Sequence, residues 1–415
     1  MGNRTSPPTA GGSAWLILLY ANRFGASLAF MMYAGALPIV MAGWGMSSGE
    51  AGSIQSAFNV SYALSLVATS WLADHLGAKR VLLWSSWVAA IATLAFALFA
   101  RSYGAGLVLF SIVGLAQGGT YTPAIMLVAQ GTAQHRRGTA VGWLLAAASL
   151  GYFGSIAIST ALAARVGYET AFLVCAAGPV LGALAAAIGM RNRPNVIAAA
   201  PGRLSFAALR FLADRRSFLL TAGYTAHCWE LLGMWAWMPA FLSPALTERS
   251  SWSAAAIGLA IAAAIHVSGA VASFAIGGAS DHFGRKAMLV TLGIAGAACS
   301  FSVALLADGP APLLLVLAAL YGFSALGDSP VLSTAMTESV DPGSLGLALA
   351  VRSILGFGAG GIAPLVFGLV LDAGGGPEGP GAGWLWAFAT LGVGGVLATF
   401  CALRLPAEPR PRPAG

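Results

Sequence analysis

Long apolar runs alternate with short polar segments along almost the whole chain. Each run has about 20 residues or more, the length that an α-helix needs to cross the roughly 30 Å hydrocarbon core of a bilayer. The pattern therefore predicts an all-α membrane protein with twelve transmembrane helices. The predicted spans are 14–41, 50–73, 80–100, 105–131, 138–163, 168–190, 218–243, 253–279, 287–306, 312–337, 345–371 and 383–404.

A polar loop occurs twice at a fixed distance. The loop after the second run reads Asp-His-Leu-Gly-Ala-Lys-Arg from Asp74, and the loop after the eighth reads Asp-His-Phe-Gly-Arg-Lys from Asp281, 207 residues later. Pro123 and Pro330 are separated by the same distance. A sequence repeat separated by half the chain length indicates two divergent copies of one unit. We therefore predict two pseudo-symmetric six-helix bundles.

The repeat and the polar segments together predict five regions. Arg191 and Pro194 end the sixth run. In 204–212, apolar residues recur at helical spacing with arginines around them. This pattern is compatible with a short helix on the membrane surface or with a plain linker. The predicted regions are a disordered tail 1–13, an N-terminal bundle 14–190, a linker 191–217, a C-terminal bundle 218–404 and a tail 405–415.

Composition excludes several classes of protein. With 58% hydrophobic and 8% charged residues, the chain lacks the polar surface of a water-soluble globule. The net charge of +7 lies in short loops, so we expect the lipid bilayer and not nucleic acid as the macromolecular partner. The four cysteines have no metal-binding spacing, and no nucleotide loop or nucleophile motif is visible. We expect no metal, no cofactor and no enzyme activity.

The distribution of Lys and Arg predicts the orientation. One set of loops and tails holds sixteen of the 21 basic residues and the other set holds three, while Arg23 and Arg352 lie inside spans. Basic residues accumulate on the cytoplasmic side of a membrane. Both termini and both repeated loops should therefore be cytoplasmic.

The repeated loops resemble the signature of the major facilitator superfamily. The resemblance covers nearly the whole chain and implies a bacterial inner-membrane secondary transporter, acting as a monomer by alternating access around a central site. It also implies that the loop residues gate the cytoplasmic side through salt bridges between helices, with Glu338 as a partner of the second loop. The implied gating residues are Asp74, Gly77, Lys79, Arg80, Asp281, Gly284, Arg285, Lys286 and Glu338.

Ionisable residues inside spans are candidates for the transport site because their burial is costly. Arg23 in the first span and Glu230 in the seventh are again 207 residues apart, and the resemblance implies that both spans line the central cavity. We expect an ion pair across the cavity, which either a substrate anion or a proton on Glu230 would break. A permanent pair that locks the halves together is the structural alternative.

His227, one helical turn before Glu230, is a candidate for substrate binding and for the proton-coupling site, and the structural alternative is a hydrogen bond to a neighbouring helix. Asp328, near Pro330 in the tenth span, is a further proton carrier or cation contact. The aromatic residues around His227, Trp229 and Trp235 among them, are interpreted as lipid-facing or core packing.

Four further residues are candidate substrate contacts. Asn59 and His266 occupy equivalent positions in the second and eighth spans and either line the cavity or bond neighbouring helices. Tyr121 offers a hydroxyl group in the fourth span. Arg352 is either a second anion contact, a side chain that reaches the membrane surface, or a partner of Asp74.

These residues favour a secondary transporter that moves a small organic or inorganic anion together with protons. A buried Arg can hold a carboxylate through two parallel hydrogen bonds, and the aromatic-rich seventh span resembles those of cyanate, nitrate and organic-anion permeases. The alternative is a proton-coupled exporter of drugs or metabolites, although the fifth span has Gly151 to Gly154 where that branch carries a Pro. A membrane enzyme or sensor is disfavoured by the short loops.

Overall fold

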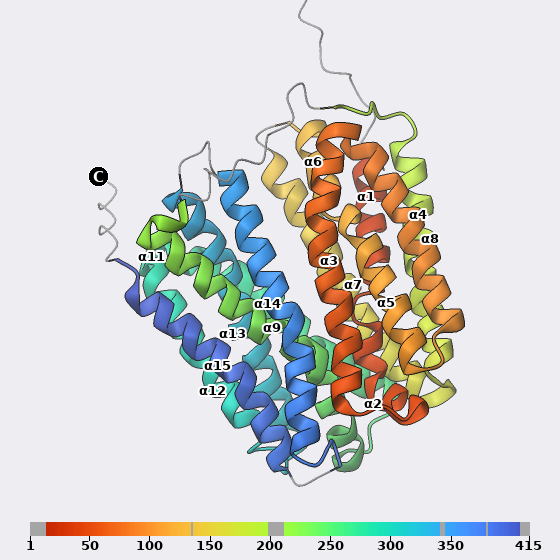
Figure 1. Ribbon diagram of the computed structural model, residues 1–415, viewed down its shortest axis with the longest axis vertical. Helices are drawn as coiled ribbons and strands as arrows, with labels where there is room; N and C mark the ends of the chain where they lie inside the picture. Colours follow the sequence, from red (N-terminus) through yellow and green to blue (C-terminus); the bar gives the residue numbers. More distant parts are fainter. Residues whose placement is uncertain (1–13, 134–135, 198–210, 341–344, 379–380, 407–415) are drawn as a thin grey trace, which may run out of the picture.

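The chain forms α-helices connected by short loops, as the computed structural model shows (Figure 1). The structure describes residues 14–133, 136–197, 211–340, 345–378 and 381–406. The predicted tail 1–13, most of the tail 405–415, and residues 204–210 of the predicted surface helix lie outside these ranges. By length and composition, ten of the helices in the described ranges could cross a membrane.

The N-terminal half packs as one bundle, coloured red to yellow-green in Figure 1. Its first predicted span consists of two helices, α1 and α2, and its fourth span consists of α5, the single turn η1 and α6. The bounds are α1 Ala14–Ser27, α2 Met32–Trp44, α3 Ser48–Leu76, α4 Ala78–Phe99, α5 Tyr103–Gln117, η1 Gly118–Thr120, α6 Thr122–Gly131, α7 Arg137–Val166 and α8 Tyr168–Met190.

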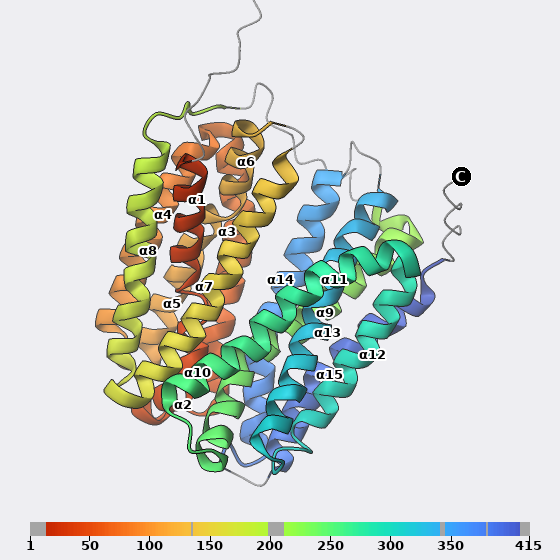
Figure 2. The same cartoon turned by 180° about the vertical axis from the view of Figure 1, so that it is seen from behind.

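The C-terminal half forms the second bundle, green to blue, whose axis is inclined to that of the first (Figures 1 and 2). Its second span is interrupted by a turn of π-helix, η4. The bounds are α9 Arg215–Arg249, α10 Ala254–Ala262, η4 Ala263–Val267, α11 Ser268–Phe283, α12 Arg285–Val303, α13 Ala311–Ser339, α14 Leu345–Ala373 and α15 Ala382–Arg404.

Local chemistry fixes the helix ends. Gly77 and Gly284 occupy the tight turns of the two repeated loops with φ of 89° and 87°, a conformation in which a side chain would be strained. At the other end of α3, the Ser47 side chain accepts a hydrogen bond from the Glu50 backbone while Glu50 accepts one from the Ser47 backbone. This reciprocal cap satisfies backbone donors that the first helical turn leaves without partners.

The two bundles pack together at the end opposite the repeated loops, which we call the far end. There, α3 approaches α14 so closely that a methyl group on Gly52 would overlap the carbonyl group of Pro364, and α10 approaches α7 closely at Gly258. The end that carries the repeated loops, which we call the motif end, differs. Toward the motif end the two bundles diverge (Figures 1 and 2). The structure is therefore closed at the far end.

Candidate functional site

Arg23 on α1 is 2% exposed and is surrounded by hydroxyl and aromatic groups. Its guanidinium group donates to Thr120 Oγ1 and to the Tyr152 hydroxyl group, each at 3.3 Å. It also lies over the ring of Tyr121, 4.9 Å from the ring centroid, and near the ring of Phe30. Among the described residues no carboxylate lies within ion-pair distance, and Nε has no hydrogen-bond partner. The positive charge is thus solvated but not neutralised.

Two helix interruptions of the N-terminal bundle surround this arginine. The break between α1 and α2 places Phe30 beside the guanidinium group, and the break at η1 places Thr120 and Tyr121 beside it. Ser155 on α7 donates to the Leu28 carbonyl group that the first break leaves outside a regular helix. Discontinuous helices are typical of transporter binding sites, where irregular backbone lies within protein rather than against lipid.

An aromatic cluster joins the arginine to the other bundle. Tyr152 on α7, which accepts from Arg23, lies 5.6 Å from the ring of Trp235 on α9 and 5.8 Å from the ring of His266 in η4. Trp235 and His266 are themselves 5.4 Å apart. His266 Nε2 and Trp235 Nε1 are both buried, and neither has a hydrogen-bond partner among the described residues. We call Tyr152, Trp235 and His266 the bridging cluster.

Glu230 does not pair with Arg23 in this structure. It is 5% exposed inside the C-terminal bundle, where its carboxylate accepts a hydrogen bond of 2.9 Å from Ser300 on α12. Ser300 in turn bonds to the hydroxyl group of Tyr321 on α13. The expected ion pair across the bundles is therefore absent, because Glu230 is directed into its own bundle.

His227 forms a pair with Asp328 on α13. Nδ1 of His227 lies 2.8 Å from Asp328 Oδ1, and Nε2 lies 3.0 Å from the Ser329 hydroxyl group. Both ring nitrogens therefore have polar neighbours, although the imidazole is only 2% exposed. A buried His beside a carboxylate can accept a proton without leaving an uncompensated charge.

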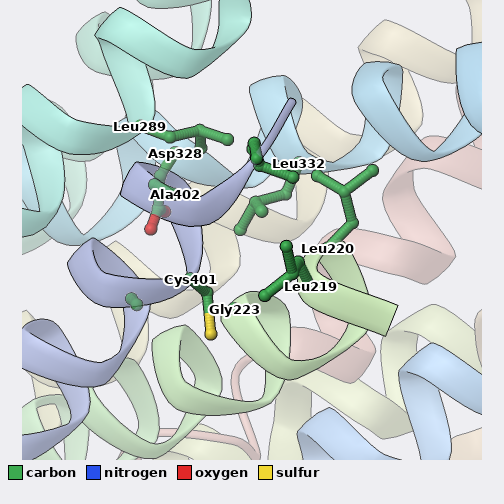
Figure 3. Close-up of a pocket in the computed structure, with 10 residues that line it drawn as sticks. Leu219, Leu220, Gly223, Leu289, Asp328, Leu332, Cys401 and Ala402 are labelled. Atoms are coloured by element: carbon green, nitrogen blue, oxygen red, sulfur yellow. The ribbon is translucent and has the colours of Figure 1, made fainter. Parts of the chain in front are cut away.

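A small pocket borders Asp328 on the motif side of the C-terminal bundle (Figure 3). Its volume of about 10 Å³ is comparable to the space that one water molecule needs. The pocket lies between α9, α12, α13 and α15. It is lined by Leu219, Leu220, Gly223, Leu289, Asp328, Leu332, Ala398, Cys401, Ala402 and Leu405.

Arg352 has its partners within its own bundle, whereas Asn59 lies at the contact between the bundles. The Arg352 guanidinium group lies 4.1 Å from the centroid of the Tyr224 ring and donates to Ser333 at 3.3 Å, so it pairs with neither Asp74 nor any other carboxylate of the described chain. Asn59 accepts from Gln55, one turn earlier on α3. Its Cβ faces Gly361 of α14 at the contact between the bundles.

The two repeated loops share one interaction and differ in another. Lys79 donates to the Arg193 carbonyl group beyond α8, and Lys286 donates to the Leu405 carbonyl group beyond α15. Each loop is thus tied to the end of its own half by the equivalent lysine. Beside the first loop, Asn195 donates to the carbonyl group of Leu76 and accepts from the backbone of Arg80.

The acidic residues of the loops are in different environments. Arg285 lies 2.6 Å from Asp281 and 3.0 Å from Glu338, so the second loop carries an ion-pair network. The first loop has Ala78 in the place of Arg285, and no ion pair of Asp74 is found within the described ranges.

Sequence reasoning does not reveal the bridging cluster. The sequence predicts that Trp235 packs in the core or against lipid, and Trp235 does pack against the hydrophobic core, but no pattern predicts that it lies beside His266. His266 and Tyr152 are recognisable as polar residues within spans, but no spacing along the sequence connects α7, α9 and η4. The density of aromatic residues around His227 is the only signal of this feature.

The chain is similar to known transporters over most of its length. The model of the Major Facilitator Superfamily matches residues 19–243 and 230–415. A probable 4-methylmuconolactone transporter of Cupriavidus pinatubonensis is 26% identical over 349 residues, which cover 80% of this chain and 78% of that protein. A probable sulfoacetate transporter of Cupriavidus necator is 25% identical over 233 residues, which cover 51% of this chain and 52% of that protein.

Two solved structures have the same fold. A bacterial homolog of the human lysosomal transporter Spinster, in an inward-facing and unoccupied conformation, superposes with a TM-score of 0.72 and covers 95% of this chain and 96% of that one. A point mutant of the nucleoside transporter NupG gives a TM-score of 0.76, with 94% and 99% covered. Both are 16% identical in sequence, so they establish the fold and not the substrate.

Proposed function

Since the chain belongs to the major facilitator superfamily, we propose that this membrane transporter carries a small organic anion together with protons. The observation that carries the proposal is Arg23, a buried cation without a carboxylate partner in the described part of the chain. A buried unpaired charge is costly, and an arriving carboxylate or sulfonate would neutralise it through charge-assisted hydrogen bonds.

The anion is proposed to lie between Arg23 and the second bundle. Arg352, on the other bundle, is also buried without a carboxylate partner among the described residues, so both halves add positive potential. Tyr121, Asn59 and His266 are the further proposed substrate contacts. The relatives named for 4-methylmuconolactone and sulfoacetate support an organic substrate that carries oxygen or acidic groups.

The proton is proposed to bind in the C-terminal bundle. Glu230 is buried with hydroxyl partners, and the His227–Asp328 pair borders the pocket that extends toward the motif end. Both groups are separate from the Arg23 site, so a proton and an anion can bind together. Transport of the proton together with the anion would reduce the net charge that crosses the membrane.

We also propose that the motif end faces the cytoplasm of a bacterial inner membrane. Sixteen basic residues on that side against three on the other support this orientation. The structure would then be open toward the cytoplasm and closed toward the outside. Reporter fusions at the two termini would test it, and a terminus found outside would contradict it.

The test of function uses purified protein in proteoliposomes that hold a pH-sensitive dye and an internal anion. Adding a small carboxylate or sulfonate outside should acidify the interior. Arg23→Ala should abolish this response, whereas Arg165→Ala, which removes an exposed arginine of the same bundle, should not. Glu230→Gln should lose acidification but keep the exchange of labelled anion.

Other outcomes would contradict the proposal. Equal transport of every tested anion by wild type and Arg23→Ala would remove Arg23 from the site. Proton efflux driven by an organic cation, with no response to anions, would favour a drug or metabolite exporter instead.

A further inference from the structure

The bridging cluster has features of a ligand site beyond those of ordinary packing. His266 is 4% exposed, Trp235 Nε1 is buried, and within the described ranges neither His266 Nε2 nor Trp235 Nε1 has a hydrogen-bond partner. Leaving a buried polar atom unpaired costs about 1–3 kcal/mol. Two such atoms on neighbouring rings indicate that a partner is missing from the cluster.

The backbone at this point is irregular as well. His266 lies in the π-helical turn η4, which separates α10 from α11. Single π-turns within α-helices are rare and occur frequently at functional sites. The turn holds the imidazole against Tyr152 of the opposite bundle, and Tyr152 is bonded to Arg23. The cluster is therefore continuous with the proposed anion site.

We propose that the bridging cluster binds the body of the transported anion, and that this body is planar and unsaturated and carries an oxygen acceptor. The inference rests on the proposed function, because Arg23 holds the charged group. The face of Tyr152 stacks on the planar body. Trp235 Nε1 and His266 Nε2 lie beside that body and supply hydrogen bonds to its oxygen.

The position of the cluster links binding to the conformational change. Tyr152 belongs to one bundle, while Trp235 and His266 belong to the other. A planar substrate that inserts among these rings must separate contacts between the bundles. The energy of binding can thereby be used to open the closed far end.

The first test compares two acids that differ in planarity and have the same charge. Benzoate and cyclohexanecarboxylate should each compete with a labelled transported anion in proteoliposomes. Because aromatic contacts contribute about 0.5–1.5 kcal/mol, benzoate should compete roughly two- to tenfold more effectively. Equal competition by both acids would overturn the proposal.

The second test uses variants that remove one group at a time. Coumalate, a planar acid whose ring carries a carbonyl oxygen, should bind more tightly than benzoate. Trp235→Phe retains a ring and deletes the N–H group, so coumalate should bind to this variant no more tightly than benzoate does. His266→Asn should weaken coumalate binding in the same direction. Thermal unfolding of each variant verifies that the protein is folded.

Trp229→Phe is the matched control. Trp229 lies on the same helix, but its Nε1 donates to the Thr390 carbonyl group within its own bundle. The Trp229→Phe variant should leave the preference for coumalate over benzoate unchanged. If Arg23 is required and all three acids are nevertheless equivalent, the cluster is not a substrate site while the anion proposal stands. If wild type transports no anion, the proposed function itself fails.

Discussion

At the scale of single residues, two guanidinium groups are buried without a carboxylate partner in the described part of the chain. Arg23 and Arg352 are 2% and 7% exposed, and hydroxyl groups and aromatic faces are their partners. A charge at mid-membrane costs roughly 2.5–3.5 kcal/mol on insertion scales. Hydroxyl and aromatic groups reduce this cost but cannot cancel the charge, which a bound anion can.

We predict that His227 and Asp328 act as one unit in proton coupling. Asp328→Asn and His227→Gln should each reduce uptake driven by a pH gradient by roughly tenfold, because each leaves its partner buried without a counter-charge. In the double variant the losses should not multiply, since residues of one network are non-additive. Initial rates in proteoliposomes give the three values.

The matched control for this cycle is Ser333→Ala, which removes a hydroxyl group of α13 that bonds to Arg352 and not to His227. It should combine additively with His227→Gln. If the reductions in uptake rate multiplied in the His227–Asp328 double variant, the two residues would act separately.

The ionisable residues of the site can be identified from the sequence, but their partners cannot. Ionisable residues inside apolar runs can be recognised because burying a charge in the membrane is costly, and this identifies Arg23, His227, Glu230 and Asp328. The shift of 207 residues between Arg23 and Glu230 marks equivalent positions in two repeats, which need not be in contact. The actual partner of Glu230, Ser300, is a neutral residue in an apolar run and gives no signal.

At the scale of helices, the far end is closed by a carboxylate that caps a helix of the other bundle. Asp372, at the end of α14, accepts hydrogen bonds of 2.7 Å from the backbone of Ser48 and of Gly49. These residues form the first turn of α3, where free N–H groups and the helix dipole favour a negative charge. The contact joins the two bundles without any basic side chain.

We predict that Asp372→Asn shifts the protein toward the conformation that is open at the far end. Removing a charge from a helix N-terminus costs about 1 kcal/mol, which corresponds to roughly a fivefold change in populations. Nitroxide labels at Ser102 and Ser251, one on each bundle, would report the shift by pulsed electron paramagnetic resonance once the native cysteines are replaced.

Glu50→Gln provides the control for this prediction. Glu50 caps the same helix end from within its own bundle, so its loss should loosen the first turn of α3 without separating the bundles. If both variants changed the distance distribution equally, the effect would belong to helix fraying and not to the contact between bundles.

The helices themselves are predictable from the sequence and their interruptions are not. Apolar length predicts each span, but the breaks between α1 and α2, at η1, and at η4 lie inside continuous apolar runs. Pro38 lies within α2 and does not mark the break before it. Such breaks depend on tertiary partners, as when Ser155 accommodates the freed carbonyl group of Leu28.

At the scale of the whole molecule, the internal repeat predicts the architecture and leaves the conformation open. The two copies of the loop predict two equivalent bundles, and Lys79 and Lys286 do make equivalent contacts. The relative position of the bundles depends on small differences in free energy between states, which no local pattern encodes. Only the structure shows that the far end is the closed one.

The close approach of α3 and α14 leads to the last prediction, which concerns alternating access. Gly52 lies against the Pro364 carbonyl group, so Gly52→Ala forces the two bundles apart at the far end. Gly104→Ala is the control, because a methyl group there meets no atom of the described residues within 4 Å. Gly52→Ala should disfavour the present conformation and slow net transport several-fold, since the cycle must pass through a closed far end.

The same substitution should leave anion binding largely intact, because Gly52 is not among the residues that contact Arg23. Spin-label distances across the far end should lengthen in Gly52→Ala and remain unchanged in Gly104→Ala. A Gly52→Ala protein with normal turnover and unchanged distances would mean that the bundles do not need this contact to close. The tight packing of α3 on α14 would then be a feature of one conformation and not a step in the transport cycle.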